Sequence, residues 1–422
     1  MKVSNNKNPL GCYKVEFEYN PAIKQFDKNL EVNREEQTIT SVGVLGTFLF
    51  YQSKMTGHTN LTGMKEKYDR YIPAKYSGDM ANIAGNYYQE MKINENGIFS
   101  TILYLPAGLY QYRLIINGKL KISEDSSSPE VFLAQDGKLY TFEQSISDMI
   151  ECGKIIKDPM NLPDAPVCDG EQQCSCLVVG NANDHSWLPC QNSIKKGMVT
   201  FVSYRDIDQK QRSLGVYLPF GYNRKKVYPV IYLSHGGFGN EVDWFYQGMA
   251  QNTMDNLIAA GKCREAILVT MNNEVYKNGR YSWDYRKISE NMIQRVEPFI
   301  ESIFSVSPKR ENHAFCGLSL GSITTMYMYM HYPERYHNYG VFSGGLAGGL
   351  DFTLENPLLK DCRLVIGCAE QDIAYNDSEI GIPSTIKKLK ENQLPFDSYF
   401  VTGSHDWYCW TQMFEYFVQK IL

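Results

Sequence analysis

Residues 313–332 read His-Ala-Phe-Cys-Gly-Leu-Ser-Leu-Gly-Ser-Ile-Thr-Thr-Met-Tyr-Met-Tyr-Met-His-Tyr, and this stretch decides the fold around it. Its first part, 313–317, predicts a buried strand, and 322–332 predicts a helix that ends near Pro333. The Gly-Leu-Ser-Leu-Gly sequence at 317–321 lies between them, which is the context of a nucleophile elbow. Two glycines permit a sharp turn that exposes the hydroxyl of Ser319 at the carboxyl end of a sheet. We therefore expect Ser319 to act as a nucleophile.

A serine hydroxyl is a weak nucleophile until a base removes its proton, so a histidine is expected beside it. Downstream of Ser319 the sequence offers His331, His337 and His405. The first two lie next to the helix that leaves the elbow, where a helix-end or surface role is expected. His405 follows a predicted strand at 397–402 and precedes the last predicted helix, so its loop is expected to face Ser319. His405 is the predicted base.

A carboxylate is needed to orient this base. The candidates are Glu370, Asp372 and Asp377, which all follow the predicted strand at 363–367. Asp372 is preferred because it lies in the loop that ends this strand, and Glu370 is the fallback. The chain order of serine, aspartate and histidine is the order found in α/β-hydrolases.

Two backbone N–H groups are expected to stabilise the oxyanion that forms when serine attacks a carbonyl. One belongs to Leu320, at the start of the helix after the elbow. The other is expected in the loop His-Gly-Gly-Phe-Gly at 235–239, where glycines allow close approach to a substrate. Gly237 is the first choice and Phe238 the second, whereas His235 is expected to hold the loop in place. Each such donor lowers the barrier by about 3–4 kcal/mol.

The segments around these residues alternate between apolar strands and amphipathic helices from about residue 198. The expected strands are 200–204, 212–218, 227–234, 266–271, 313–317, 339–343, 363–367 and 397–402, and the expected helices are 249–260, 288–304, 322–332 and 410–422. This alternation predicts a mostly parallel sheet covered by helices on both faces. The fold class is therefore α/β, with an α/β-hydrolase domain at 198–422.

The first part of the chain, 1–145, has a different pattern, which predicts a small antiparallel β-sandwich of the immunoglobulin-like kind. In the strand at 109–116, Tyr110, Tyr112, Leu114 and Ile116 fall on one face at period two. Asn-Gly at 117–118 is expected to form a hairpin turn. Residues 146–197 are rich in proline, glycine, aspartate and asparagine, so they are expected to form a linker.

Composition excludes several classes of function. The 422 residues carry a net charge of −5, which argues against a basic surface for nucleic acid or for an anionic membrane. No apolar run approaches the roughly 18 residues of a membrane span. No phosphate-binding glycine loop, dinucleotide motif or metal-binding histidine motif is present, so no cofactor and no metal is expected. Oligomeric state cannot be predicted from these features.

The eleven cysteines are odd in number and cannot all pair internally. Cys316, Cys362 and Cys368 lie in strand-like runs and are expected to be buried, inert thiols. The cluster Cys168, Cys174, Cys176 and Cys190 leaves open a disulfide or unpaired thiols, with a zinc site less favoured because the spacing matches no common ligand pattern. The N-terminus lacks the apolar segment of a signal peptide, so the protein is either cytoplasmic or had its signal removed.

Together these residues resemble the putative esterase family of α/β-hydrolases, which includes feruloyl, acetylxylan and enterochelin esterases and mycolyltransferases. The resemblance spans about 198–422. Besides the elbow, it is carried by Val-Tyr-Leu-Pro-Phe-Gly-Tyr at 216–222, Tyr-Pro-Val-Ile-Tyr-Leu at 228–233 with the loop that follows, Asp-Asn-Leu-Ile at 255–258, Glu-Pro-Phe-Ile-Glu at 297–301 and Gly-Ser-His-Asp-Trp at 403–407. One departure is Ser322, since the elbow usually continues with a glycine.

Residues 40–118 resemble the sandwich that precedes such esterases, similar to carbohydrate-binding module 48. Gly-Thr-Phe at 46–48, Asn-Gly-Ile-Phe at 96–99 and 106–118 carry this match. The tryptophan that usually follows the Gly-x-Phe segment is missing, which leaves open whether this domain binds sugar or only shapes the active-site cleft. The whole arrangement is most similar to gut and rumen bacterial feruloyl esterases of carbohydrate esterase family 1.

The resemblance implies a serine esterase that releases aromatic acids from hydroxycinnamoylated plant polysaccharide or oligosaccharide, secreted after removal of a signal. Trp244, Phe245, Trp407 and Trp410 lie near the predicted site loops, where they would either flank an aromatic acyl group or pack in the core. The alternatives are an acetylxylan esterase, an enterochelin-type siderophore esterase, and a carbohydrate-binding protein with a decayed esterase domain. The loops show no cluster of cations for an anionic iron chelate, which argues against the siderophore substrate.

Overall fold

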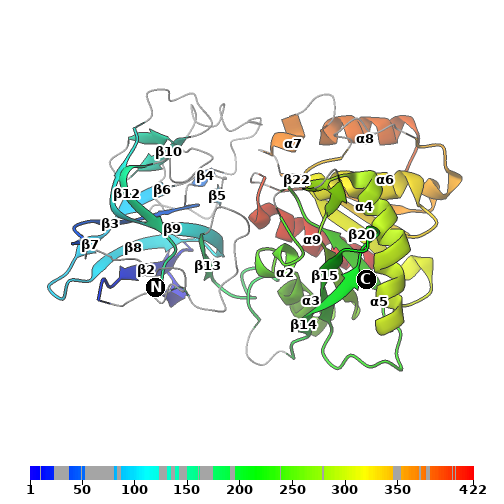
Figure 1. Ribbon diagram of the computed structural model, residues 1–422, viewed down its shortest axis with the longest axis horizontal. Coiled ribbons are helices and arrows are strands. Elements are labelled where there is room, and N and C mark those ends of the chain that lie inside the picture. Colours follow the sequence, from blue (N-terminus) through cyan, green and yellow to red (C-terminus); the bar gives the residue numbers. More distant parts are fainter. Residues whose placement is uncertain are drawn as a thin grey trace. The chain divides into compact units, whose positions relative to one another are not determined.

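The computed structural model describes residues 1–9, 11–22, 38–48, 50–52, 80–82, 87–122, 131–134, 138–141, 150–159, 161, 174–190, 195–237, 239–277, 280–345, 353–369, 372–376, 381–401, 403 and 405–422. The chain divides into two units, Met1–Gly180 and Asn181–Leu422 (Figure 1). Within the described residues, no helix is both long and apolar enough to cross a membrane.

The described residues of unit 1 form β-strands, most of them in two main sheets. The first sheet has the order β1 (Lys2–Lys7), β2 (Tyr13–Tyr19), β8 (Phe99–Leu105), β7 (Lys92–Ile93). The second has the order β11 (Leu139–Thr141), β10 (Val131–Ala134), β6 (Tyr87–Glu90), β3 (Val42–Gly46), β9 (Gly108–Leu120), β12 (Ile150–Ile156), with β13 (Ser175–Val179) also paired to β9. A separate pair is formed by β4 (Phe50–Gln52) and β5 (Met80–Asn82).

The core of unit 1 lies between its two main sheets. Phe17 of β2 packs edge-on against Tyr112 of β9, with ring centroids 5.2 Å apart. Tyr110, Tyr112, Leu114 and Ile116 are all buried, as their period-two spacing predicts. Unit 1 is thus a β-sandwich, and its strand pairs are antiparallel except for β10 with β6.

The structure differs from the sequence-based expectation at two places in unit 1. Asn-Gly at 117–118 forms no hairpin, because β9 runs unbroken from Gly108 to Leu120. The positive φ of Asn117 (47°) is accommodated at an irregularity in the pairing of β9 with β12, opposite Gly153. The expected linker at 146–197 also differs, since it contains β12 and β13, which both pair with β9. The range 146–197 is therefore not a linker as a whole.

Unit 2 is built on an eight-stranded sheet. Its order is β14 (Met198–Arg205), β15 (Gln211–Leu218), β17 (Ile267–Met271), β16 (Val230–Ser234), β20 (His313–Leu318), β21 (Asn338–Phe342), β22 (Arg363–Ala369), β23 (Asp397–Val401). The pairs from β17 to β23 are parallel, and β14 and β15 add antiparallel strands at one side. A two-stranded hairpin of β18 (Glu274–Lys277) and β19 (Arg280–Trp283), absent from the sequence prediction, follows β17.

Helices cover both faces of this sheet (Figure 1). They are α2 (Asp243–Tyr246), α3 (Ala250–Ala259), α4 (Tyr285–Asn291), a π-helical turn (Met292–Val296), α5 (Glu297–Ile303), α6 (Leu320–His331), α7 (Ile373–Asn376), α8 (Ile382–Glu391) and α9 (Trp407–Ile421), with 3₁₀ turns at Arg310–Asn312 and Pro357–Lys360. Along β16, Val230 and Tyr232 pack with α4, α5, α6 and α8, whereas Ile231 and Leu233 pack with α2, α3 and α9. The predicted parallel sheet with two covered faces is confirmed.

Candidate active site

Ser319 lies at the junction of β20 and α6, in a backbone conformation that only a tight turn requires. Its φ is 50° and its ψ is −121°, which is strained for a residue with a side chain. Its N–H donates to the carbonyl oxygen of Phe342 on the neighbouring strand at 2.9 Å, which fixes the turn to the sheet. The strain at Ser319 is the mark of a nucleophile elbow.

The two glycines of the elbow are required by close backbone contacts. A Cβ added at Gly317 would lie 2.2 Å from the carbonyl oxygen of Gly321. A Cβ added at Gly321 would lie 2.5 Å from the carbonyl oxygens of Ser234 and His235. Any side chain at either position would therefore push α6 away from β20 or from the end of β16, and Ser319 would move with it.

His405 lies between the predicted nucleophile and the predicted carboxylate. Its Nε2 is 2.9 Å from the Oγ of Ser319, and its Nδ1 is 2.9 Å from the Oδ1 of Asp372. The three side chains come from the loops that follow β20, β22 and β23, at the carboxyl ends of parallel strands. A histidine held in this way accepts the serine proton at Nε2 while the carboxylate fixes its tautomer through Nδ1.

The environments of the two partners of Ser319 differ. Asp372 is fully buried, and its Oδ1 also accepts a hydrogen bond from the backbone N–H of Ala374 at 2.8 Å. The His405 side chain keeps 23% of its surface exposed. The ring of Trp410 packs edge-to-face against the imidazole, with centroids 4.9 Å apart. The carboxylate is thus sealed from solvent, whereas the histidine remains open to a substrate.

The loop after β16 lies against the elbow, as the oxyanion prediction requires. A Cβ added at Gly236 would lie 3.1 Å from the Cβ of Ser319, and one added at Gly237 would lie 3.2 Å from the Cδ1 of Leu320. Leu320 is the first residue of α6, so its N–H has no acceptor within the helix. The structure therefore brings Gly237 next to Leu320, and the neighbouring Gly236 next to Ser319.

Hydrogen bonds of His235 hold this loop in place. Its Nε2 accepts a hydrogen bond from the backbone N–H of Asn273 at 2.9 Å, so the ring proton is on Nδ1 and is donated to the carbonyl oxygen of Gly236 at 2.7 Å. The side-chain amide of Asn273 donates in return to the carbonyl oxygen of His235. Burial lowers the pKa of His235 to about 4, so the ring is neutral at pH 7.

Two of the four predicted substrate-contacting aromatic residues lie in the core instead. Trp244 and Phe245 are each 1% exposed, and the indole of Trp244 packs against the rings of Trp407 and Phe414. Trp244 thus faces α9, whereas Phe245 lies close to Gly215 of β15. Trp407 keeps partial exposure, and Trp410 contacts His405 directly. Only these last two aromatic residues remain beside the site.

Three supporting residues were not predicted from the sequence as part of the site. Ser322 donates from its Oγ to the carbonyl oxygen of Ser319 at 2.6 Å, a bond that the usual glycine could not make. Gly344 leaves room for that hydroxyl, because an added Cβ would lie 1.7 Å from it. Asn273 holds the His235 loop, and its place two residues after a buried strand is the one signal for it in the sequence. No sequence signal indicates that Ser322 and Gly344 meet.

The alternative candidates fall elsewhere. His337 lies beside Arg310 and Asp361, and His331 is exposed at the end of α6. Glu370, Asp377 and Phe238 lie outside the described residues, as does Cys168. Cys316, Cys362 and Cys368 are buried as expected, and burial raises the pKa of Cys362 to about 11.

Comparison with known proteins gives a match to one family. Residues 207–350, which include the loop after β16 and the elbow, match the family described as putative esterase. This segment is therefore similar to that family. The chain is also similar to curated proteins: over 254 residues, 57% of its length, it is 27% identical to the endo-1,4-beta-xylanase/feruloyl esterase of Xylanibacter ruminicola. The chain covers about a third of that relative's length (33%).

Solved structures show the same fold. The carbohydrate esterase family 1 ferulic acid esterase of Anaeromyces mucronatus is 24% identical with a TM-score of 0.50, over 56% of this chain and 95% of its own. The enterobactin esterase of Shigella flexneri is 14% identical with a TM-score of 0.54, over 100% of this chain and 95% of its own. The second of these structures has a similar fold over the whole of this chain, unit 1 included.

Proposed function

We propose that this chain is a serine carboxylic ester hydrolase that releases hydroxycinnamic acids, ferulic acid in particular, from plant cell-wall polysaccharide. The hydrogen-bonded series from Ser319 through His405 to Asp372, at 2.9 Å for both contacts, carries this proposal. A strained serine backed by a histidine and a buried carboxylate is suited to acyl transfer. The names of the Xylanibacter relative and of the Anaeromyces structure support an aromatic acid as the acyl group.

The proposed reaction has two steps. The Oγ of Ser319 attacks the ester carbonyl while Nε2 of His405 takes its proton. Asp372 stabilises the imidazolium that forms, and the N–H groups of Gly237 and Leu320 bind the negative oxygen. His405 then protonates the departing sugar hydroxyl, which leaves an acyl-serine. A water molecule that loses its proton to His405 hydrolyses this intermediate and releases the acid.

The test is hydrolysis of methyl ferulate and of 4-nitrophenyl acetate by the wild-type protein, compared with Ser319→Ala and His405→Ala. The matched control is His331→Ala, since this exposed histidine lies on the same unit at the end of α6. Release of ferulate that disappears in both site variants and persists in the control supports the proposal. Hydrolysis of acetate alone would move the substrate to acetylated xylan.

A siderophore trilactone is the second ester to assay, because the fold of the Shigella enterobactin esterase matches this chain over its full length. Hydrolysis of the trilactone with no release of ferulate would replace the proposed substrate. If Ser319→Ala were as active as the wild type, the proposed nucleophile would be contradicted. A protein inactive on every ester but able to bind polysaccharide would support the binding-protein alternative.

A further inference from the structure

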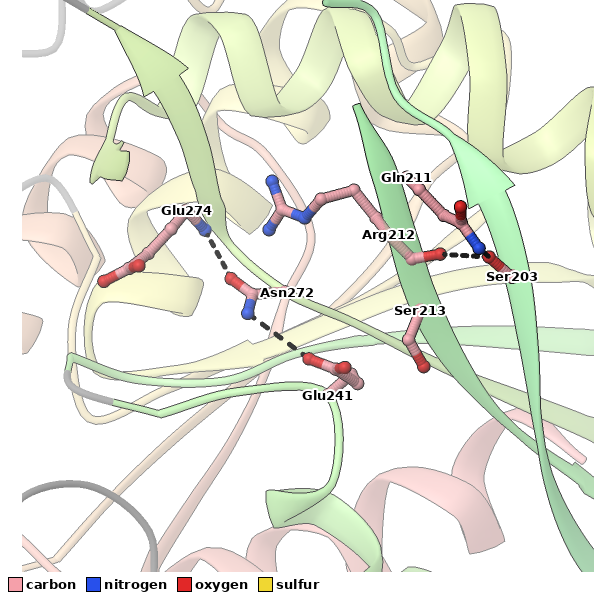
Figure 2. A pocket seen from close by; sticks show the side chains of 7 residues that line it. All are labelled: Ser203, Gln211, Arg212, Ser213, Glu241, Asn272 and Glu274. Atoms are coloured by element: carbon pink, nitrogen blue, oxygen red, sulfur yellow. Dashed lines mark hydrogen bonds between the residues drawn. The ribbon is translucent and has the colours of Figure 1, made fainter. Parts of the chain in front are cut away.

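A polar pocket opens beside the candidate active site, at the end of the sheet formed by β14, β15 and β17 (Figure 2). Its volume is about 460 Å³. It is lined by Ser203, Gln211, Arg212, Ser213, Glu241, Asn272 and Glu274. The proposed reaction uses none of these side chains.

The polar groups of this pocket are held in place by one another. Nε2 of Gln211 donates to Oγ of Ser203 at 3.0 Å, and Nδ2 of Asn272 donates to Oε2 of Glu241 at 3.3 Å. Oδ1 of Asn272 accepts from the backbone N–H of Glu274 at 2.9 Å, and Figure 2 shows these groups arranged around the opening. Fixed amide and carboxylate groups offer both donors and acceptors to a ligand with many hydroxyls.

An exposed aromatic pair lies next to the pocket. Phe201 and Tyr246 are 40% and 37% exposed, and their ring centroids are 6.3 Å apart. Phe201 is two residues before Ser203 on β14, so both side chains project from the same face of the strand. Exposed rings beside fixed polar groups suit a ligand with apolar C–H faces and hydroxyl edges, which is the chemistry of a sugar.

The charges in the pocket favour a neutral ligand. Glu241 and Glu274 contribute two negative charges, and Arg212 contributes one positive charge. The guanidinium of Arg212 also faces the buried carboxylate of Asp206 at 3.6 Å. The balance is therefore negative, which disfavours phosphate, uronate or an anionic chelate. A neutral polyhydroxylated chain meets no such penalty.

The pocket lies within reach of the nucleophile. Ser234 of β16 pairs with Met271 on one side and with Gly317 on the other. Met271 and Gly317 therefore lie two strand spacings, about 10 Å, apart. Met271 directly precedes Asn272 of the pocket, and Gly317 begins the elbow. The loop that carries Gly237 also continues to Glu241, which lines the pocket. A short oligosaccharide can span this interval along the edge of the sheet.

We propose that this pocket, with Phe201 and Tyr246, is a subsite for the neutral sugar chain to which the ester is attached. The proposal rests on the proposed function, because it assigns the pocket to the alcohol side of the same ester. A simple methyl ester does not reach the pocket. Sugar-linked ferulate therefore gains binding energy that methyl ferulate lacks.

The test compares kcat/KM on a feruloylated arabinoxylan oligosaccharide with kcat/KM on methyl ferulate. Phe201→Ala and Glu274→Ala are each expected to lower the first about three- to tenfold more than the second, the usual effect of one lost ring contact or hydrogen bond. The matched control is Phe220→Ala. Phe220 is 52% exposed but follows the opposite end of β15, so its loss should leave the ratio unchanged.

Equal losses on both substrates, or no loss on the sugar-linked ester, would overturn the subsite. A second measurement separates this failure from failure of the proposed function. Binding of a neutral arabinoxylan oligosaccharide without ferulate is measured by calorimetry on Ser319→Ala, with and without Phe201→Ala. If Phe201→Ala weakens this binding while the wild-type protein hydrolyses no ferulate, the sugar subsite is supported and the proposed esterase function is contradicted. If the wild type hydrolyses ferulate but Ser319→Ala binds no oligosaccharide, the esterase function is supported and the subsite is contradicted.

Discussion

The neutral, buried His235 makes the stability of unit 2 depend on pH in a way that a single substitution can reveal. Its pKa is lowered from 6.5 to about 4, chiefly because burial disfavours the charged ring. The folded state therefore resists protonation at pH values where the unfolded chain already binds a proton. Stability from this residue is fully present above pH 6.5 and is lost as the pH falls toward 4.

The magnitude follows from the two pKa values. Between pH 7 and pH 5 the unfolded state binds a proton that the folded state mostly does not bind. This difference lowers the free energy of unfolding by about 2 kcal/mol. The full difference, reached below pH 4, is about 3 kcal/mol. His235→Gln removes the titration while keeping a side chain that can hydrogen-bond the loop. The variant is expected to lose about 2 kcal/mol less than the wild type between pH 7 and pH 5.

Tryptophan fluorescence measures this quantity for unit 2 alone. All five tryptophans, at 187, 244, 283, 407 and 410, lie in Asn181–Leu422. Denaturant unfolding followed by fluorescence at several pH values gives the pH slope for each protein. His331→Gln is the control, because this histidine is exposed. If the free energy of unfolding of His235→Gln had the same pH dependence as that of the wild type, His235 would not be the neutral, buried group described above.

Three further outcomes follow from the site. Asp372→Asn should lower kcat, measured by steady-state kinetics, about 10⁴-fold with little change in folding, because an amide facing Nδ1 of His405 favours the wrong tautomer. The control Asp397→Asn changes an exposed carboxylate and should leave kcat unchanged. Gly344→Ala should lower the free energy of unfolding, measured with denaturant, by at least about 1–3 kcal/mol, because its Cβ would lie 1.7 Å from Oγ of Ser322. Adding Ser322→Gly should recover part of the loss, and an unchanged unfolding midpoint in Gly344→Ala would contradict the packing. Trp410→Leu should lower kcat severalfold while KM stays near the wild-type value, since the indole orients His405; a change in KM alone would assign Trp410 to substrate binding.

Local sequence was enough to predict that Ser319, His405 and Asp372 would lie together. A strand, a glycine-flanked serine and a helix at 313–332 can hardly be arranged in another way, and a parallel sheet brings the ends of its strands to one edge. The loops with Asp372 and His405 follow from the same rule. For this reason, three side chains far apart in the sequence could be named together.

What the sequence could not provide depends on packing between distant elements. Trp244 packs inward against Trp407 and Phe414 of α9, and no local pattern encodes that contact. The sequence analysis missed the pairing of β12 and β13 with β9, because the proline-rich composition of this range suggests a linker. The polar pocket combines residues from β14, β15 and the segments 241 and 272–274, which meet only once the sheet has formed.

The position of His405 ties the proposed activity to one edge of the described sheet. Ser319 and Asp372 follow β20 and β22, whereas His405 follows β23, which lies at the end of the strand order, and contacts Trp410 of α9. If β23 and α9 separated from the sheet, Ser319 would lose its proposed base while the elbow stayed in place. Local unfolding of this edge would therefore abolish the proposed hydrolysis before the rest of the sheet unfolds.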